Sequence, residues 1–379
     1  MTSLDTGPEG EPARQLALQI ALQIQQAGSL AELQCAGLGV DALVEALHAN
    51  GTPVERIASA VRDLNRPLFA RLWELLAPPA LVANSCLIVM GSEGRGEQIL
   101  KTDQDNALLL RDGFVGPAFG PLALARLTAR FTAALIELGY PRCAGNIMLS
   151  NPLWCQPVTA FRATLRDWLF GAAPDGALNL AIFLDAAAVA GDATLLAQAR
   201  AFVDDFLVDD DAFFARFASA IEQFSEAPGA PWWARLAGWR GGAPHGRESG
   251  PGGQGGPGAS IDLKKLGTFP IVHGVRALAL QYRIDVPGTA ARLAALAAQA
   301  HLPAALAGEL TQALQLLMAL KLDHHLRQLH AAPAGGVRID NRVALALLSP
   351  AQRDALHNAL AAVKQLRQHL RLHYRLDVL

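Results

Sequence analysis

The string GSEGRGEQILKTDQDN occupies residues 91–106, directly after the largely apolar run at 81–90. An apolar run of this length predicts a buried strand, which Gly91 and Ser92 end. Residues 93–100 then predict a helix, whose first backbone N–H groups have no partner inside the helix. A strand, a small-residue turn and a helix start can together bind phosphate oxygens, because the N-terminus of a helix carries partial positive charge.

Two carboxylates, Asp103 and Asp105, come just before the apolar residues 107–110. We expect a second strand at 103–110, in which both carboxylates lie on one face and Gln104 on the other. At roughly 4 Å and an effective dielectric of about 20, two like charges repel by about 4 kcal/mol. A divalent cation removes this repulsion, and Mg²⁺ is usually held by one or two carboxylates together with substrate phosphates. The sequence therefore predicts neighbouring phosphate and Mg²⁺ (or Mn²⁺) sites, as nucleotidyl or phosphoryl transfer requires.

Each motif has a simpler explanation when it is taken alone. A glycine-rich turn after a strand is common, and this one fits neither the dinucleotide-binding pattern G-x-G-x-x-G nor the P-loop, which needs G-K-[ST]. An Asp-x-Asp pair is more often a solvated turn. The functional interpretation depends on the two motifs occurring together, in this order, between apolar strands.

This stretch also carries a family resemblance. The stretch resembles the signature of the polymerase-beta-type nucleotidyltransferase superfamily, and the matching residues are Gly91, Ser92, Arg95, Asp103 and Asp105. The longer strings at 91–98 and 102–106 are more specific, and they resemble a bacterial nucleotidyltransferase family related to the PII-protein uridylyltransferases. Members often follow cyclic-nucleotide-binding and CBS modules, neither of which we expect in this chain.

The resemblance covers roughly residues 50–379. In the first half, further matches are C-x-G-N-I-M at 143–148, N-P-x-W at 151–154, Asp185, and Gly191-Asp192. In the second half they are I-D-L-K-K at 261–265, P-I-V at 270–272, Arg276, and Asp340-Asn341. The second half thus resembles the substrate-binding domain of the same family.

The resemblance implies a Mg²⁺-dependent enzyme that moves an NMP group from an NTP to an acceptor hydroxyl. A protein tyrosine is one acceptor that the PII relation suggests. The implied catalytic acids are Asp103, Asp105 and Asp185, of which Asp103 and Asp105 hold the metal. The implied nucleotide-binding residues are Gly91, Ser92, Gly94, Arg95, Asn106, Lys264 and Lys265.

Several of these residues have an alternative structural role. Asp185 stands alone in an apolar run, so it is a third acid near the metals, a solvated residue, or a carboxylate held by a charge partner. The family usually has Asp-x-Arg here, and this chain has Ala187 in place of the arginine. Arg95 can bind phosphate or pair with an acid such as Glu97. Asn106 and Asn146 can orient groups of the site or serve packing alone. Lys264 and Lys265 suit phosphates or an acidic partner, or a solvated face.

The composition narrows the function classes. The 379 residues are 51% hydrophobic and 17% charged, with a net charge of −2 and no long basic run, which argues against a nucleic-acid partner. The four cysteines have no C-x-x-C spacing and predict free thiols in a reducing cytosol. The sequence has no run of 18 apolar residues, so we expect no membrane-spanning helix. We therefore expect a cytoplasmic protein whose partners are an NTP and an acceptor, with no membrane partner.

The expected fold class is α+β, with a small mixed-sheet core between an N-terminal helical lead and a C-terminal helical bundle. The expected segments are a disordered tail at 1–13, a helical region at 14–78, the nucleotidyltransferase domain at 79–195, a helical connector at 196–240, a Gly-rich flexible linker at 241–259, and the substrate-binding domain at 260–379. The last helix before the core should be interrupted near Asn65-Arg66-Pro67, and a capping box should open it at Thr52.

Within these segments, the core should contain a helix at 121–138, a strand at 143–150 and helices from 158 onward. The C-terminal helices should cover 270–283, 289–300, 303–331 and 350–377, with a second capping box at Ser349. His324 and His325 are adjacent on one such helix and point about 100° apart, so a packing or solvated role is favoured over a metal site.

The main alternative to an enzyme is a catalytically weak nucleotide sensor or protein-interaction module on the same fold. The absence of the family's arginine at position 187 favours that alternative slightly. The intact glycine, serine, arginine and paired aspartates of the 91–105 stretch favour an enzyme more strongly.

Overall fold

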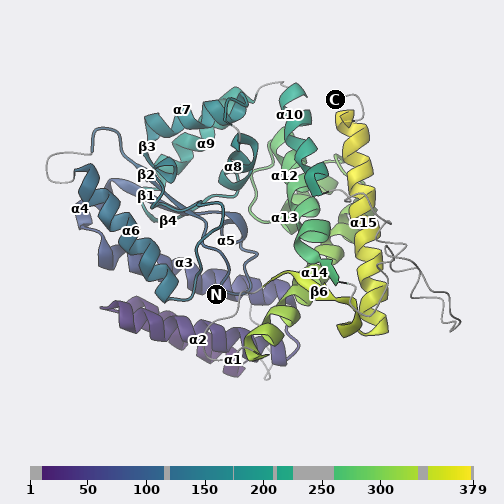
Figure 1. Ribbon diagram of the computed structural model, residues 1–379, viewed down its shortest axis with the longest axis horizontal. Helices are drawn as coiled ribbons and strands as arrows, with labels where there is room; N and C mark the ends of the chain where they lie inside the picture. Colours follow the sequence, from purple (N-terminus) through teal and green to yellow (C-terminus); the bar gives the residue numbers. More distant parts are fainter. Residues whose placement is uncertain are drawn as a thin grey trace, which may run out of the picture. The chain divides into compact units, whose positions relative to one another are not determined.

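The computed structural model describes residues 11–114, 120–173, 175–207, 211–224, 260–331 and 340–376. The chain folds as two compact units, Met1–Asp210 and Asp211–Leu379. Helices dominate both units, and a small mixed sheet forms the centre of the first (Figure 1), which confirms the α+β class. The predicted flexible linker lies outside the described residues, as does most of the predicted tail.

The first unit begins with three helices that pack on one another: α1 (Glu11–Gln26), α2 (Leu30–Ala49) and α3 (Val54–Leu76). Apolar residues recur every three or four positions and are buried, as in an amphipathic helix. Two details of the prediction are wrong. The N-cap residue of α3 is Pro53, whose side chain cannot accept a hydrogen bond, so the capping box at Thr52 does not form. In addition, α3 runs unbroken through Pro67.

The sheet contains four short strands in the order β3-β2-β1-β4. They are β1 (Ser85–Val89), β2 (Asn106–Leu110), β3 (Cys155–Pro157) and β4 (Ala187–Gly191). β1 runs antiparallel to both of its neighbours, while β2 and β3 are parallel. Every residue of β1 and β2 is buried, so both faces of the sheet are covered.

Helices cover the two faces of this sheet. Figure 1 shows α3 and α6 (Pro121–Glu137) on one side, and α7 (Val158–Leu169) and α9 (Thr194–Phe206) on the other. Two short helices, α4 (Pro79–Ala83) and α8 (Gly176–Phe183), precede β1 and β4. The aromatic core of this unit is formed by Trp73, Phe131, Trp154, Phe161, Trp168 and Phe183.

Three segments near the predicted site differ from expectation. The helix predicted at 93–100 is only α5 (Gly91–Arg95), because Gly96 adopts a left-handed conformation with φ of 70° and ends it. The strand predicted at 143–150 does not form. Asn146, with φ of 54°, makes a turn there, and the third strand forms instead at β3. The strand predicted at 103–110 begins at Asn106, after an isolated bridge at Gln104.

The second unit is a helical bundle with a two-stranded ribbon. It contains α10 (Asp211–Ser219), a 3₁₀ turn (Ala220–Phe224), β5 (Ser260–Asp262), a π-helical turn (Lys264–Thr268), α12 (Phe269–Gln281), α13 (Thr289–Ala298), α14 (Ala304–Ala331), β6 (Arg342–Ala344), a 3₁₀ turn (Leu345–Leu347) and α15 (Pro350–Tyr374). The four predicted C-terminal helices are confirmed to within three residues at each end. The ribbon of β5 and β6 was not predicted.

None of the helices among the described residues combines the length and the apolar character that a membrane span needs.

The predicted capping box at Ser349 is formed. The Ser349 hydroxyl accepts from the Gln352 backbone N–H at 3.2 Å, and the Gln352 side chain accepts from the Ser349 backbone N–H at 2.9 Å. Since Ser349 is exposed, Ser349→Ala should remove only the cap and lower the free energy of unfolding by about 1 kcal/mol. Urea unfolding checks this, with Ser349→Asp, which keeps an acceptor, as the control. Equal losses in both variants would contradict the capping role.

Candidate functional site

The turn between β1 and α5 lies directly beside the acidic pair. β1 and β2 pair in a register that places Val89 opposite Asn106, and the next residue, Met90, donates its N–H to the Asp105 carbonyl oxygen at 2.9 Å. The pairing thus carries the end of β1 and the start of β2 to the same edge of the sheet. This edge brings the predicted phosphate turn next to Asp105, one of the two predicted metal carboxylates.

Gly91 allows this close approach. Its φ is 57°, a left-handed conformation that favours glycine, and a Cβ atom at this position would clash with the Asp105 carboxylate oxygen Oδ2. The backbone of the turn therefore lies against the carboxylate with no side chain between them. Gly94 has a similar constraint, because a Cβ there would clash with the Asp185 carbonyl oxygen.

The acidic pair has the alternation that the sequence predicts. Asp103 is exposed and Asp105 is half-buried, while Gln104 and Asn106 point into the core. Gln104 is held there by the Tyr140 carbonyl oxygen, to which its Nε2 donates at 3.1 Å. Asp105 lies against the Gly91 turn, and Asp103 is exposed to solvent.

The two carboxylates fit a Mg²⁺ site of the kind that takes most of its ligands from water and phosphate. Within the described ranges no three His, Cys, Asp or Glu side chains come together as a metal cluster. An all-protein cage is therefore not formed by these residues. One or two carboxylates are the protein contribution that Mg²⁺ usually needs, so Asp105 with Asp103 could supply it.

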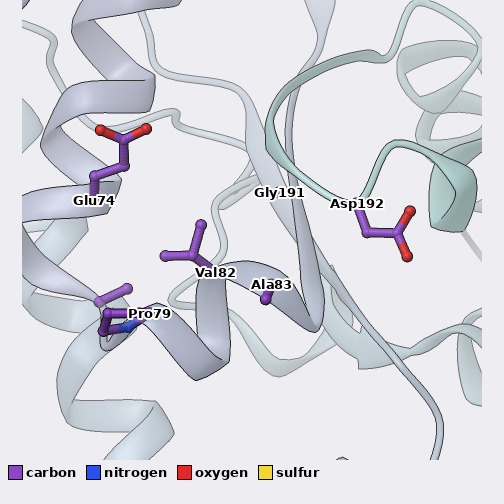
Figure 2. A pocket seen from close by; sticks show the side chains of 7 residues that line it. Glu74, Pro79, Val82, Ala83, Gly191 and Asp192 are labelled. Atoms are coloured by element: carbon purple, nitrogen blue, oxygen red, sulfur yellow. The ribbon is translucent and has the colours of Figure 1, made fainter.

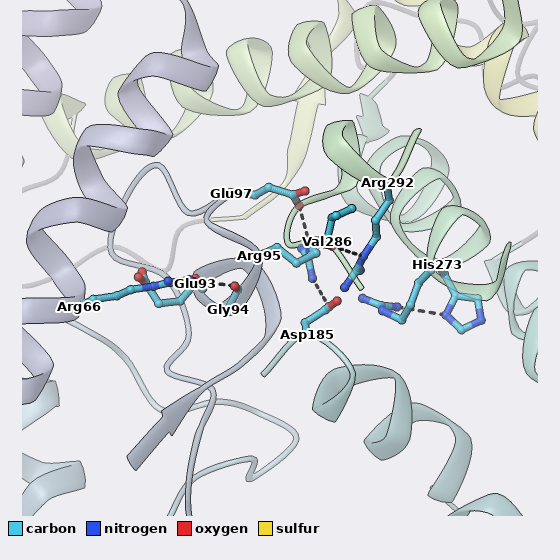
Figure 3. A network of polar contacts seen from close by, with 10 residues as sticks. Arg66, Glu93, Gly94, Arg95, Glu97, Asp185, His273, Val286 and Arg292 are labelled. Carbon is cyan, nitrogen blue, oxygen red and sulfur yellow. Dashed lines mark hydrogen bonds and ion pairs between the residues drawn. The ribbon is translucent and has the colours of Figure 1, made fainter. Parts of the chain in front are cut away.

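Arg95 is held between two carboxylates (Figure 3). Its Nε lies 2.6 Å from Glu97 Oε2, and its Nη1 lies 2.6 Å from Asp185 Oδ2. Burial lowers the pKa of Arg95, but the charges of Glu97 and Asp185 outweigh burial and raise the pKa above its usual value. Of the roles weighed for Arg95, the pairing with acids is present in the structure.

Asp185 has the charge partner that the sequence left open. Its side chain has no exposed surface and lies in the ion pair with Arg95, 90 positions away along the chain. The family's arginine two residues after this aspartate is Ala187 here, in β4. The turn after β1 thus supplies a positive charge to Asp185.

A second buried network fixes the turn from the side of α3. The Glu93 side chain is buried and accepts from Asn65 Nδ2 at 3.0 Å, and the Asn65 Oδ1 accepts from the Tyr140 hydroxyl at 2.7 Å. Arg66 adds a hydrogen bond from Nη2 to the Gly94 carbonyl oxygen at 3.0 Å. Burial raises the pKa of Glu93 to about 7, against the lowering effect of Asn65 and Arg66.

The sequence analysis missed this network. It interpreted Asn65-Arg66-Pro67 as an interruption of a helix, although the helix continues there. The available signal was the pair of polar residues within the apolar periodicity of α3 and the glutamate inside the motif at 91–98. A polar residue on a core-facing position of a helix indicates a buried partner, and here that partner is Glu93.

The remaining predicted residues lie elsewhere. Asn106 points into the core, where it accepts from the Leu149 N–H at 2.9 Å. Lys264 and Lys265 belong to the second unit and are exposed on its π-helical turn, where the Lys265 N–H donates to Asp262 Oδ1 at 2.9 Å. Arg276, also of the second unit, is buried, and its Nη1 lies 3.4 Å from His273 Nδ1.

The two adjacent histidines have a packing role, as expected. His325 is buried and its Nε2 lies 3.1 Å from the Asp340 carbonyl oxygen, while His324 Nε2 lies 3.2 Å from Asp340 Oδ1. Burial lowers the pKa of His325 to about 4, which keeps this imidazole neutral. These contacts tie α14 to the start of β6.

A hollow in the first unit is separate from the candidate site (Figure 2). It is lined by Glu74, Ala77, Pro79, Val82, Ala83, Gly191 and Asp192. It lies where β1 begins, next to Ser85, whereas the acidic pair lies where β1 ends. Both of its carboxylates already have a partner: Asp192 pairs with Arg111 at 2.7 Å, and Glu74 pairs with Arg71 at 3.1 Å.

Two family comparisons agree with this geometry. Residues 39–175 match the family described as "Putative nucleotidyltransferase DUF294", and residues 252–374 match its "Putative nucleotidyltransferase substrate binding domain". The chain belongs to this nucleotidyltransferase family. The first match contains the Gly91 turn and the acidic pair, and together the two matches span more than half of the chain. Comparison with curated proteins gives no match.

The first prediction concerns the close approach at Gly91. Gly91→Ala should cost about 1–2 kcal/mol for the left-handed backbone and an additional amount for displacing Asp105. Gly113→Ala is the matched control, because Gly113 has φ of 74° and nothing within 4 Å of its would-be Cβ. Urea unfolding of both variants should show the larger loss for Gly91→Ala. Equal losses would mean that the turn does not press on the carboxylate.

The second prediction concerns Glu93, whose pKa is raised from 4.5 to about 7 in the folded chain. Between these values the folded state binds more protons than the unfolded state, so stability falls as the pH rises through this window and levels off above it. Glu93→Gln should therefore remove a pH-dependent loss of up to about 3 kcal/mol between pH 4.5 and pH 8. Urea unfolding across that range checks this.

Glu55→Gln provides the control, because it changes an exposed carboxylate at the start of the same helix that carries Asn65. This variant should keep the pH dependence of the parent protein. A Glu93→Gln protein with an unchanged pH profile would contradict the buried, proton-binding state of Glu93.

Proposed function

We propose that the chain is a Mg²⁺- or Mn²⁺-dependent nucleotidyltransferase that moves an NMP group from an NTP to an acceptor hydroxyl. The observation that carries the proposal is the close approach of the Gly91 backbone to the Asp105 carboxylate. A triphosphate on this turn would lie beside the Asp105 carboxylate. Such a juxtaposition is favourable when a divalent cation lies between phosphate and carboxylate.

Each residue of the turn has a proposed task. Asp103 and Asp105 hold the metal, and the backbone of Gly91 and Ser92 with the Ser92 hydroxyl binds the terminal phosphates. Bound Mg²⁺ would neutralise the charge that develops on the reacting phosphate oxygens. α5 has only five residues, so the helix dipole contributes less here than the backbone N–H groups and the hydroxyl do.

The roles of Arg95 and Asp185 are coupled through their ion pair. We propose that Asp185 contributes as a third acid through its effect on Arg95, and that Arg95 contacts a nucleotide phosphate while it stays paired with Asp185. Because Arg95 also pairs with Glu97, an incoming phosphate has to share the guanidinium with both carboxylates. Gly94 serves this arrangement by letting the turn lie against the Asp185 backbone.

The division into domains follows the same proposal. The chemistry belongs to residues 79–195, and the domain at 260–379 recognises the acceptor or the nucleotide, with Lys264 and Lys265 as exposed cations on its π-helical turn. Localised π-helical turns are frequent at functional sites. A protein acceptor in the cytoplasm fits the chain's lack of a long basic run. The family relation leaves uridylyl and adenylyl transfer both open.

The alternative function is a nucleotide sensor that binds NTP without turning it over. One experiment separates the two. The purified chain is incubated with each of the four NTPs, Mg²⁺ or Mn²⁺, and an extract of acceptor proteins, and mass spectrometry looks for an added NMP. Transfer onto protein supports the enzyme, while metal-dependent binding with no transfer and no pyrophosphate release supports the sensor.

The metal assignment gives a sharper prediction. Asp103→Asn combined with Asp105→Asn should abolish Mg²⁺-dependent NTP binding, and stability without metal should hold or rise because the mutual repulsion is lost. Calorimetric titration with Mg²⁺ and NTP measures the first effect, and urea unfolding measures the second. Asp175→Asn, which neutralises another exposed carboxylate of the first unit, is the control and should bind as the parent does. Unchanged affinity in the double variant would overturn the metal assignment.

A further inference from the structure

The segment between α5 and β2 carries Asp103 and has little regular structure. Residues 97–103 form neither helix nor strand, and the first β-type pairing after α5 is the isolated bridge between Gln104 and Arg142. The hydrogen bonds of a helix or a sheet therefore do not fix the backbone that leads to Asp103. Contacts made by side chains have to hold it instead.

Lys101 anchors this segment to the N-terminal helices. Its Nζ donates to the Gly37 carbonyl oxygen at 2.9 Å and lies 2.6 Å from Asp41 Oδ2, and both partners belong to α2. The same Nζ lies 5.8 Å from the centroid of the Tyr140 ring, within the range of a cation–π attraction. Only 12% of the Lys101 side chain is exposed, although lysine is mostly a surface residue. The tip of this side chain is thus fixed by a helix that lies about 60 positions earlier in the chain.

Two glycines leave room for the Lys101 side chain. A Cβ atom at Gly37 would lie 3.5 Å from Lys101 Nζ, and a Cβ atom at Gly139 would lie 3.1 Å from Lys101 Cδ. Gly139, in the turn after α6, also has φ of 95°, which favours glycine. The side chain is therefore packed against both α2 and this turn.

Asp103 lies between two fixed points of the chain. Lys101 holds the backbone two residues before it. Gln104, the next residue, is held by its Nε2, which donates to the Tyr140 carbonyl oxygen at 3.1 Å, and by its N–H, which donates to the Pro141 carbonyl oxygen at 3.1 Å. The backbone at the exposed Asp103 is therefore restrained on both sides before any ligand binds.

We infer that Lys101 is a positioning residue for the proposed metal site, and that it keeps the Asp103 backbone in place by tying it to α2. The inference rests on the proposed function, because that function assigns Asp103 to the metal. Without the anchor, metal binding would have to order this segment, and ordering the backbone of one residue weakens binding by roughly tenfold. Lys101 touches neither the metal nor the phosphates in this role.

The test measures the affinity for Mn²⁺ alone, by the loss of the free-ion signal in electron paramagnetic resonance. It compares Lys101→Met, Asp41→Asn and the two changes combined. If only charge mattered, loss of the lysine would strengthen cation binding, loss of the aspartate would weaken it, and the combined variant would bind nearly as the parent does. If Lys101 is an anchor, Lys101→Met and the combined variant should both raise the Mn²⁺ dissociation constant by roughly tenfold.

The combined variant decides the outcome, because it leaves neither member of the ion pair without its partner and so remains useful if Lys101→Met does not fold. Arg130→Met, which removes an exposed cation from α6 of the same unit, is the control and should bind Mn²⁺ as the parent does. Parent-like or tighter binding by the combined variant, with no binding by the double aspartate variant, would overturn the inference and leave the metal site standing. A parent protein that does not bind Mn²⁺, or binding that survives in the double aspartate variant, would overturn the metal assignment and the inference together.

Discussion

The site depends on a turn in which two positions, Gly91 and Gly94, have no room for a Cβ atom. The backbone at Gly91 lies against the Asp105 carboxylate, and the backbone at Gly94 lies against the carbonyl oxygen of Asp185. Because β1 pairs with both β2 and β4, its end is where the acids of two separate chain segments come close. A methyl group at either glycine would push one of these segments away. The sheet register and the two glycines therefore act as one constraint that brings the acids and the turn together.

The charged side chains around this turn are largely buried, and each is paired with an opposite charge or a hydrogen-bond partner. Arg95 lies between Glu97 and Asp185, and the Asp185 side chain has no exposed surface. A buried ion pair adds little net stability, because desolvation offsets much of the attraction, but it fixes geometry strongly. The Glu93 side chain instead bonds to Asn65 of α3. The turn is thus anchored to two sides of the unit, which leaves its backbone rigid where phosphate is proposed to bind.

The sequence predicted the helices well and the site in part. Apolar residues recur at helical spacing over long segments, and this pattern predicted the bounds of α12 to α15 to within three residues. The third strand was misplaced because the turn at Asn146 depends on a left-handed backbone that composition does not reveal. The fourth strand, Ala187–Gly191, lies in an apolar run that fits a helix or a strand equally well. The pairing of Arg95 with Asp185 joins residues 90 positions apart, which no local pattern contains.

That long-range pair also bears on the choice between enzyme and sensor. The family resemblance leads us to expect an arginine two positions after Asp185, where this chain has Ala187. Here Arg95 brings a guanidinium to the Asp185 carboxylate at 2.6 Å, so the absence of an arginine at 187 does not leave this acid without a nearby cation. The carboxylates proposed for a Mg²⁺ site, which usually needs one or two, are Asp103, which is exposed, and Asp105, which is half-buried. The alanine at position 187 therefore does not by itself argue for the sensor over the enzyme, because Asp185 has a cation partner in this chain.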